Sequence, residues 1–281
     1  MNYEELTARV VAWAQTQPTI RALISVGSRA RTNYPADRWS DLDLVIFCAE
    51  RDAYVSSSAW LKTFGDSWLT YLEITGGGDP EWFALYGDSL KLDVVLLLID
   101  PNAGDLESIL AAHPYKAVFA RGVNVLFDRH APPRIVPAQP LRPSVFPTQS
   151  AYDTIANGFL VDALTMSKFI ARGDLWRAER WLNEFLRASL LTMIEWQAHG
   201  KDTWYKGRFI EQWADPRVIA ALHETFALYE RTSLQNALLA TLDLFRLIGT
   251  EVAVGFGLTY PTAAHETLRD VIVSSFAEAN P

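Results

Sequence analysis

Two aspartates separated by one leucine stand at the start of an apolar segment, "DLDLVIFC", which begins at Asp41. Alternate side chains of a β-strand point to the same face and each residue rises about 3.3 Å, so the carboxylates of Asp41 and Asp43 lie roughly 6.5 Å apart. Such a pair is repulsive unless a cation lies between the two groups. Carboxylate oxygens are the ligands that Mg²⁺ prefers, commonly together with substrate phosphates. The pair therefore predicts a Mg²⁺ site.

A third acid, Asp93, stands near the start of a second apolar segment, residues 92–99. Two-ion sites for phosphoryl transfer normally need three acidic ligands. If the second segment is a strand beside the first, all three carboxylates meet at one place on the sheet. We therefore predict Asp41, Asp43 and Asp93 as the metal ligands of a nucleotide-processing site.

A Gly27-Ser28 pair follows a short apolar segment, residues 20–26. Glycine lets the backbone approach a phosphate closely, and serine caps a helical turn whose N–H groups face an anion. We expect Arg29 to offset the charge of a triphosphate and Arg38 to lie at the surface. A lone Gly-Ser or Asp-x-Asp is usually only a turn or a solvated pair. Their combination with a third acid indicates a site for metal and nucleotide.

The elements that must position these residues alternate between helix and strand. Such alternation is typical of an α+β fold with a mixed sheet flanked by helices, which we assign to residues 1–130 as the nucleotide- and metal-binding domain. We expect a helix over residues 3–16, strands over 20–26, 41–48, 67–75 and 92–99, and a turn over 76–80.

A proline-rich segment, residues 131–149, predicts an extended linker, because proline lacks the N–H that a helix or central strand needs. Residues 150–281 then read as a helical, substrate-binding bundle. The helices expected there span residues 151–171, 175–199 with Asp174 as N-cap, 216–229, 233–254 and 262–278.

The composition narrows the class of protein. A net charge of −8 argues against a nucleic-acid partner and favours a cationic small molecule. A single cysteine excludes an internal disulfide, and the histidines lack metal-ligand spacing. No apolar run reaches the roughly 20 residues of a membrane span, and the N-terminus reads as an amphipathic helix rather than a signal peptide. We expect a cytoplasmic protein without a membrane partner. The sequence does not predict its oligomeric state.

Gly-Ser, an Asp-x-Asp after twelve further residues and a later third acid resemble the signature of the DNA polymerase β-like nucleotidyltransferases. Within that superfamily, "GSRAR" and "DRWSDLDLVIF" resemble the opening motif of the aminoglycoside 6-adenylyltransferase (streptomycin adenylyltransferase) family. Residues 174–197 resemble its helical signature, and "WYKGRFIEQW", residues 204–213, resembles the segment that follows. The resemblance covers nearly the whole chain.

This resemblance implies transfer of AMP from ATP to a hydroxyl of a streptomycin-like aminoglycoside, with release of pyrophosphate. Asp41 and Asp43 would hold Mg²⁺ against the triphosphate, and Asp93 would be metal ligand, general base or both. The stretch before Asp93 is shorter than expected of the resistance enzymes, so a lincosamide, another metabolite or a protein side chain remains an alternative acceptor. A non-catalytic nucleotide-binding or toxin–antitoxin partner is a further alternative, although unused acids would only repel one another.

We expect the acceptor between the domains, where small-molecule sites often form. Trp176, Glu179 and Asn183 share one helix face, and Glu195 follows further along. Carboxylates between aromatic rings suit a polycationic sugar, although such tryptophans are often core and such glutamates solvated. Lys206 is either a ligand of the nucleotide phosphates or an exposed loop lysine.

Overall fold

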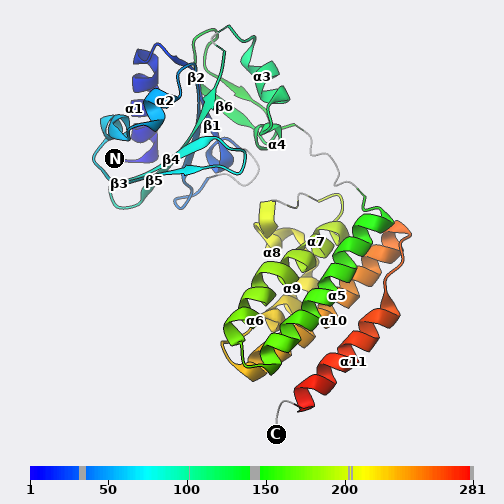
Figure 1. Ribbon diagram of the computed structural model, residues 1–281. Helices are drawn as coiled ribbons and strands as arrows, with labels where there is room; N and C mark the ends of the chain where they lie inside the picture. The colour runs from blue at the N-terminus through cyan, green and yellow to red at the C-terminus, as the bar shows by residue number, and fades with distance from the viewer. Residues whose placement is uncertain (32–35, 101, 140–145, 202, 204, 279–281) are drawn as a thin grey trace. The chain divides into compact units, whose positions relative to one another are not determined.

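A computed structural model describes residues 1–281 apart from 32–35, 101, 140–145, 202, 204 and 279–281 (Figure 1). The chain forms two compact units, Met1–Pro140 and Leu141–Pro281, which are described separately. The boundary between the units falls inside the segment predicted as a linker. Residues 140–145 of that segment lie outside the described residues.

The first unit is built on a seven-stranded sheet with the order β3-β4-β5-β2-β1-β6-β7. Of the pairs between described strands, β2 and β5 alone run parallel, and all other neighbours are antiparallel. The strands are β1 (Ile20–Val26), β2 (Leu42–Cys48), β3 (Ser67–Ile74), β4 (Pro80–Tyr86), β5 (Leu90–Leu98), β6 (Val123–Asp128) and β7 (Arg134–Val136).

Helices cover both faces of the central strands (Figure 1). On one face, Leu42 and Leu44 of β2 pack with α1, and on the other, Val45 and Phe47 pack with α3 and α4. Burial on both faces explains why β2 reads as a continuous apolar run. The helical segments are α1 (Tyr3–Thr16), η1 (Gly27–Arg29), α2 (Asp52–Val55), η2 (Ala59–Phe64), α3 (Leu106–Ala112) and α4 (Lys116–Phe119).

The predicted fold class is confirmed: an α+β unit with a mixed sheet is followed by a helical unit. The expected helix 3–16 and the expected strands are present within two residues of their predicted ends. Three further strands, β4, β6 and β7, were not predicted. In β4 the buried side chains alternate with half-buried ones, as expected of a strand with one open face.

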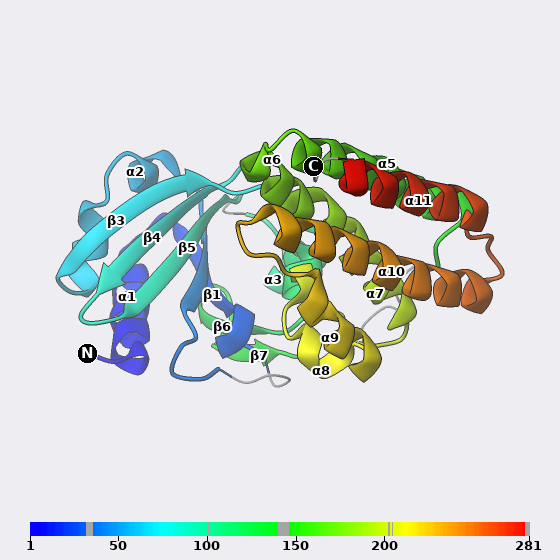
Figure 2. The ribbon, with the colours of Figure 1, turned by 90° about the horizontal axis from the view of Figure 1, so that it is seen from below.

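The second unit is helical (Figure 2). Its core lies between α5 and α10, where the rings of Phe159 and Phe245 stack with centroids 3.6 Å apart. The Tyr152 hydroxyl also donates to the carbonyl of Gly249, at 2.6 Å. No described helix is long and apolar enough to cross a membrane. The elements are α5 (Gln149–Ala171), α6 (Leu175–Trp181), η3 (Leu182–Leu186), α7 (Arg187–Gln197), η4 (Tyr205–Gly207), α8 (Ile210–Trp213), α9 (Pro216–Leu222), η5 (His223–Thr225), α10 (Arg231–Phe256) and α11 (Thr262–Glu278).

Two predicted helices differ from the observed ones. The helix expected over 175–199 contains a π-helical turn, η3, and the side chain of its N-cap residue Asp174 makes no capping hydrogen bond. The helix expected over 216–229 ends as α9 at Leu222 and is followed by η5, after which Phe226 adopts an extended backbone. A π-helical turn contains one extra residue and so changes which residues share a helix face. The spacing of apolar residues in the sequence does not reveal this change.

A buried ion pair joins two strands of the first unit. Arg21 of β1 and Asp128 of β6 are both more than nine-tenths buried, and the Arg21 guanidinium donates to the Asp128 carboxylate. Arg134 donates to the other carboxylate oxygen at 3.1 Å. Removing one partner of such a pair leaves an uncompensated buried charge.

We expect Asp128→Ala to lower the free energy of unfolding of the first unit by about 3 kcal/mol, because Arg21 then stays buried without its partner. Urea unfolding followed by circular dichroism measures this loss. The double variant Arg21→Met, Asp128→Leu, which replaces both charges by apolar groups, should recover most of it. Equal losses in the single and double variants would show that packing, and not the charge, is responsible.

Candidate active site

The structure brings the three predicted aspartates together on one face of the sheet. Asp43 and Asp93 are directly opposite each other in the parallel register of β2 and β5, and Asp41 immediately precedes β2. The Lys91 ammonium lies between two of them, with Nζ 3.0 Å from Oδ2 of Asp41 and 2.7 Å from Oδ2 of Asp93. One lysine therefore offsets the repulsion between these two carboxylates.

Asp93 is the most buried of the three acids, with 8% of its surface exposed. Its Oδ1 is buried and has no hydrogen-bond partner among the described residues. Burial raises the pKa of Asp93 to about 6, while the hydrogen bond from Lys91 works in the opposite direction. Burial alone would lower the pKa of Lys91, but its hydrogen bonds to Asp93 and Asp41 raise it overall. The ammonium therefore stays charged beside its two carboxylates.

The donor set fits a divalent cation, although its atoms are not gathered as ligands. No group of three or more His, Cys, Asp or Glu side chains in the described part of the chain is placed to hold a metal ion. The ammonium of Lys91 separates the carboxylates of Asp41 and Asp93. The oxygen chemistry is nevertheless that preferred by Mg²⁺, and the orphaned Oδ1 of Asp93 offers one such ligand. A cation at this place would replace Lys91.

The Gly27-Ser28 turn lies against this cluster. Val26, the last residue of β1, pairs with Asp43, so the turn η1 begins beside that carboxylate. Gly27 has a φ of +69°, and a Cβ there would overlap Oδ2 of Asp43. This position requires glycine for two reasons: the backbone is left-handed, and the side chain of Asp43 occupies the place that a Cβ would take. Ser28 is buried in the turn.

Arg29 holds the chain that leads into β2. Its guanidinium donates to the carbonyl of Asp41 at 3.0 Å and to that of Ser40 at 2.8 Å, and it packs 3.7 Å from the ring centroid of Tyr3. In this structure Arg29 therefore positions the backbone of Asp41. The predicted contact of Arg29 with a triphosphate stays a prediction. Arg38 is exposed, as expected, and packs over Trp39.

Sequence reasoning missed two charged residues on this face, Lys91 and Glu81. Glu81 of β4 is opposite Val95 of β5, so it lies on the same face as Asp93 and one row away. Burial and then the charge of Asp93 raise the pKa of Glu81 to about 7. The alternation in "EWFALY" is the signal that would have placed Glu81 on a strand, with Trp82 turned into the core.

The predicted acceptor residues of the second unit are only partly gathered. The Asn183 amide donates to Oε1 of Glu179 at 2.7 Å, and Arg187 donates to Oδ1 of Asn183. Trp176 is 72% exposed. Glu195 is half-buried, which raises its pKa, and no contact between described residues joins it to the other three. The predicted roles of these four residues stay predictions.

Lys206 is exposed and has a left-handed backbone with a φ of 54°. It belongs to η4, in the segment whose sequence resembles the family pattern. Trp204, at the start of that segment, lies outside the described residues. The predicted contact of Lys206 with nucleotide phosphates therefore also stays a prediction.

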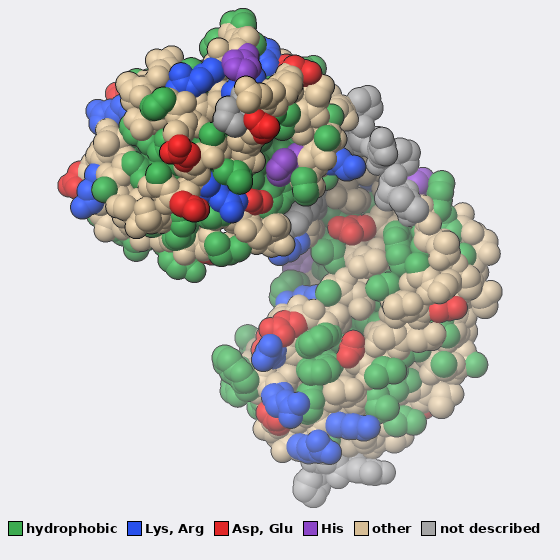
Figure 3. All heavy atoms as spheres, turned by 45° about the horizontal axis from the view of Figure 1, so that its top comes forward, with side chains coloured by type: hydrophobic (Ala, Val, Ile, Leu, Met, Phe, Trp, Pro, Cys, Tyr) green, Lys and Arg blue, Asp and Glu red, His purple; other side chains and the backbone are tan. Residues whose placement is uncertain are grey.

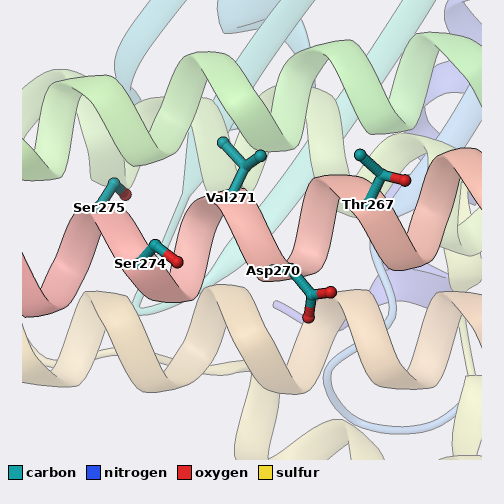
Figure 4. A pocket seen from close by; sticks show the side chains of 5 residues that line it. All are labelled: Thr267, Asp270, Val271, Ser274 and Ser275. Carbon is teal, nitrogen blue, oxygen red and sulfur yellow. The ribbon is translucent and has the colours of Figure 1, made fainter.

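Two hollows elsewhere do not contain the aspartate cluster. One of about 510 Å³ lies along α11, where Figure 4 shows its lining side chains. They are Thr267, Asp270, Val271, Ser274 and Ser275. Another of about 530 Å³ is lined by Arg21 and Asp128 among other residues. Acidic and basic side chains are intermingled on the face seen in Figure 3, without one continuous basic patch. The aspartate cluster remains the candidate site.

Gly27→Ala should destabilise the first unit more than a strained glycine elsewhere does. Gly87 is the matched control, since its φ is +52° and a Cβ there would meet no atom within 4 Å. We expect Gly87→Ala to cost about 1 kcal/mol for the backbone alone. Gly27→Ala should cost at least ~1 kcal/mol more, because its methyl group also displaces Asp43. Equal losses in urea unfolding would contradict the close approach.

The streptomycin adenylyltransferase family matches residues 1–274. The chain is 25% identical to an aminoglycoside 6-adenylyltransferase of Campylobacter jejuni over 90% of this chain and 88% of that protein. It is 24% identical to the one of Bacillus subtilis (strain 168) over 92% of each. A crystal structure of an aminoglycoside 6-adenyltransferase from Bacillus subtilis aligns with a TM-score of 0.47 and 18% identity, covering 98% and 99% of the two chains. The chain belongs to the streptomycin adenylyltransferase family, whose members are nucleotidyltransferases.

Proposed function

We propose that this protein transfers AMP from ATP to a hydroxyl of an aminoglycoside, of the streptomycin type, in a Mg²⁺-dependent reaction that releases pyrophosphate. The observation that carries the proposal is the register of β2 and β5, which sets Asp43 opposite Asp93 beside the Gly27 turn. Membership of the adenylyltransferase family and the names of the two relatives support the same reaction.

Asp41, Asp43 and Asp93 would hold the divalent cation. When bound, the cation neutralises triphosphate charge and stabilises the departing pyrophosphate. The Gly27-Ser28 turn offers backbone N–H groups at a place where a glycine admits close approach. We assign Arg29 to the same end of the nucleotide, next to the carbonyls of Ser40 and Asp41 that it already binds.

Asp93 is the best placed of the three acids to accept the proton of the attacking hydroxyl. Its Oδ1 has no hydrogen-bond partner, and burial raises the pKa of its carboxyl to about 6. A base with a pKa near the working pH is the more effective one. Because a bound cation would lower this pKa, the role as ligand and the role as base compete at one residue.

The acceptor in this proposal is cationic, in keeping with the net charge of −8. Trp176, Glu179, Asn183 and Glu195 are proposed as its contacts in the helical unit, and Lys206 as a contact of the nucleotide. A ring stacked on an exposed tryptophan and amines paired with carboxylates would suit an amino sugar.

Asp41→Asn, Asp43→Asn and Asp93→Asn should each lower pyrophosphate release with ATP, Mg²⁺ and an aminoglycoside by about 100-fold or more. We expect the urea midpoint of Asp43→Asn to equal or slightly exceed that of the wild type, because one repelling charge is removed. Asp88→Asn, in the exposed turn between β4 and β5, is the matched control and should keep full activity. Near-normal turnover in any of the three variants would remove that residue from the site.

Pyrophosphate release, measured with a panel of aminoglycosides and lincosamides as acceptors, distinguishes the proposed function from its alternatives. Pyrophosphate release with aminoglycosides and not with lincosamides is the expected result. Release with lincosamides alone would retain the chemistry and change the acceptor. Nucleotide binding without release for any acceptor would show a binding module.

A further inference from the structure

The face of the sheet that carries the aspartates continues beyond them onto β4 and β3. Cross-strand register sets Tyr71 opposite Phe83 and Phe83 opposite Asp93, while the next row sets Glu73 opposite Glu81. Directly opposite residues share a face, so these five side chains lie on the same side of the sheet. We call Tyr71, Glu73, Glu81 and Phe83 the β3–β4 platform.

The described apolar cores of the first unit include none of the four platform residues. The core on the α1 side takes Trp82, Ala84 and Tyr86 from β4, and the described core on the other side takes no residue from β3 or β4. Figure 2 shows β3, β4 and β5 from the side away from α1. The platform is therefore an open extension of the aspartate site within one unit.

Two rings form the apolar part of the platform. Tyr71 is 55% exposed and stacks on Phe83, with centroids 6.0 Å apart and planes 27° apart. The Lys91 ammonium lies 5.1 Å from the Phe83 centroid. The ring faces thus already attract one cation, and the exposed ring of Tyr71 offers a surface for another.

Two carboxylates form its charged part. Glu73 is exposed and Glu81 half-buried, and neither side-chain carboxylate has a hydrogen bond or ion pair with any described residue. Like charges nearby, chiefly on Asp93, act on Glu81 in addition to its burial. A half-buried carboxylate in such company is stabilised by an external cation.

An independent observation connects the platform with the reacting centre. The buried Oδ1 of Asp93, in the same row as Phe83 and Tyr71, has no hydrogen-bond partner in the part of the chain that the structure describes. Strand geometry sets Glu81 and Asp93, which are diagonal neighbours, roughly 8 Å apart at their backbones. A single substituted six-membered ring spans such a distance, with its hydroxyl near Asp93 and its charged groups near Glu81.

We propose that the β3–β4 platform binds one charged ring of the acceptor, an amino- or guanidino-substituted ring. The ring face stacks on Tyr71, and two cationic groups pair with Glu73 and Glu81. The inference rests on the proposed function and deepens it, because it assigns one charged ring of the acceptor to the sheet of the first unit.

Steady-state kinetics and calorimetry test the platform together. Glu81→Gln, whose carboxylate is half-buried, should raise the KM for the aminoglycoside about tenfold, and the exposed Glu73→Gln should raise it about two- to fivefold. Neither variant should change the KM for ATP. Tyr71→Leu should raise the same KM, and Tyr71→Phe, which keeps the ring, should restore it. Glu50→Gln, an exposed carboxylate at the far end of β2, is the control and should behave as the wild type.

Charge specificity is measured with an aminoglycoside that carries no guanidino group and whose amines have all been acetylated, so that the compound has no charge. The wild type and Glu81→Gln should bind this neutral compound equally, because the carboxylate then has no cation to pair with. A tenfold difference that persists with the neutral acceptor would assign Glu81 a structural role and overturn the platform.

Calorimetric titration with the unmodified aminoglycoside separates this inference from the proposed function. Binding that Glu81→Gln weakens tenfold supports the platform, even where the wild type releases no pyrophosphate and the proposed function alone fails. Turnover and dissociation constants that are equal in wild type, Glu73→Gln and Glu81→Gln overturn the platform and leave the proposed function standing. Absence of both binding and turnover in the wild type overturns both.

Discussion

The parallel pairing of β2 with β5 holds mutually repelling carboxylates on neighbouring strands, and the rest of the site depends on it. Asp43 and Asp93 can stay opposite each other because the strands that carry them are fixed by apolar packing on both faces. A slip of one residue in β2 would turn Leu42 and Leu44 out of the core. The free energy of core burial thus maintains an arrangement that electrostatics alone would open.

Lys91 and Arg29 both stabilise this arrangement of carboxylates, Lys91 through its charge and Arg29 through backbone hydrogen bonds. Lys91 pairs with Asp41 and Asp93, and Arg29 binds the backbone that leads to Asp41. Three ionised carboxylates beside one ammonium carry a formal charge of −2, which equals in size the charge of one divalent cation. A cation that replaced Lys91 would release the ammonium beside the acids, where phosphate charge would be its natural partner.

The sequence predicted the helices and strands that have a local pattern of apolar residues. It did not predict the contacts between residues that are far apart in the chain. β2 and β5 were predictable because buried strands read as apolar runs, and the register then followed for Asp43 and Asp93. β4 was missed because turn residues flank it closely, so the position of Glu81 beside Asp93 was hidden. The hydrogen bonds of Arg29 to backbone carbonyls depend on the path of a loop, and that path cannot be predicted from the residue types.

The position of Lys91 would also allow one acidic face to bind the two cationic partners proposed for it, a metal ion and an acceptor. A polycationic acceptor would be attracted to the three aspartates as strongly as to any glutamate, and would then compete with the metal ion. The ammonium of Lys91 lies between Asp41 and Asp93 and within 5.1 Å of the Phe83 centroid, which places a positive charge at the border of the platform. Its repulsion would direct amines toward Glu73 and Glu81, and a metal ion that replaced Lys91 would repel the same amines with its own positive charge.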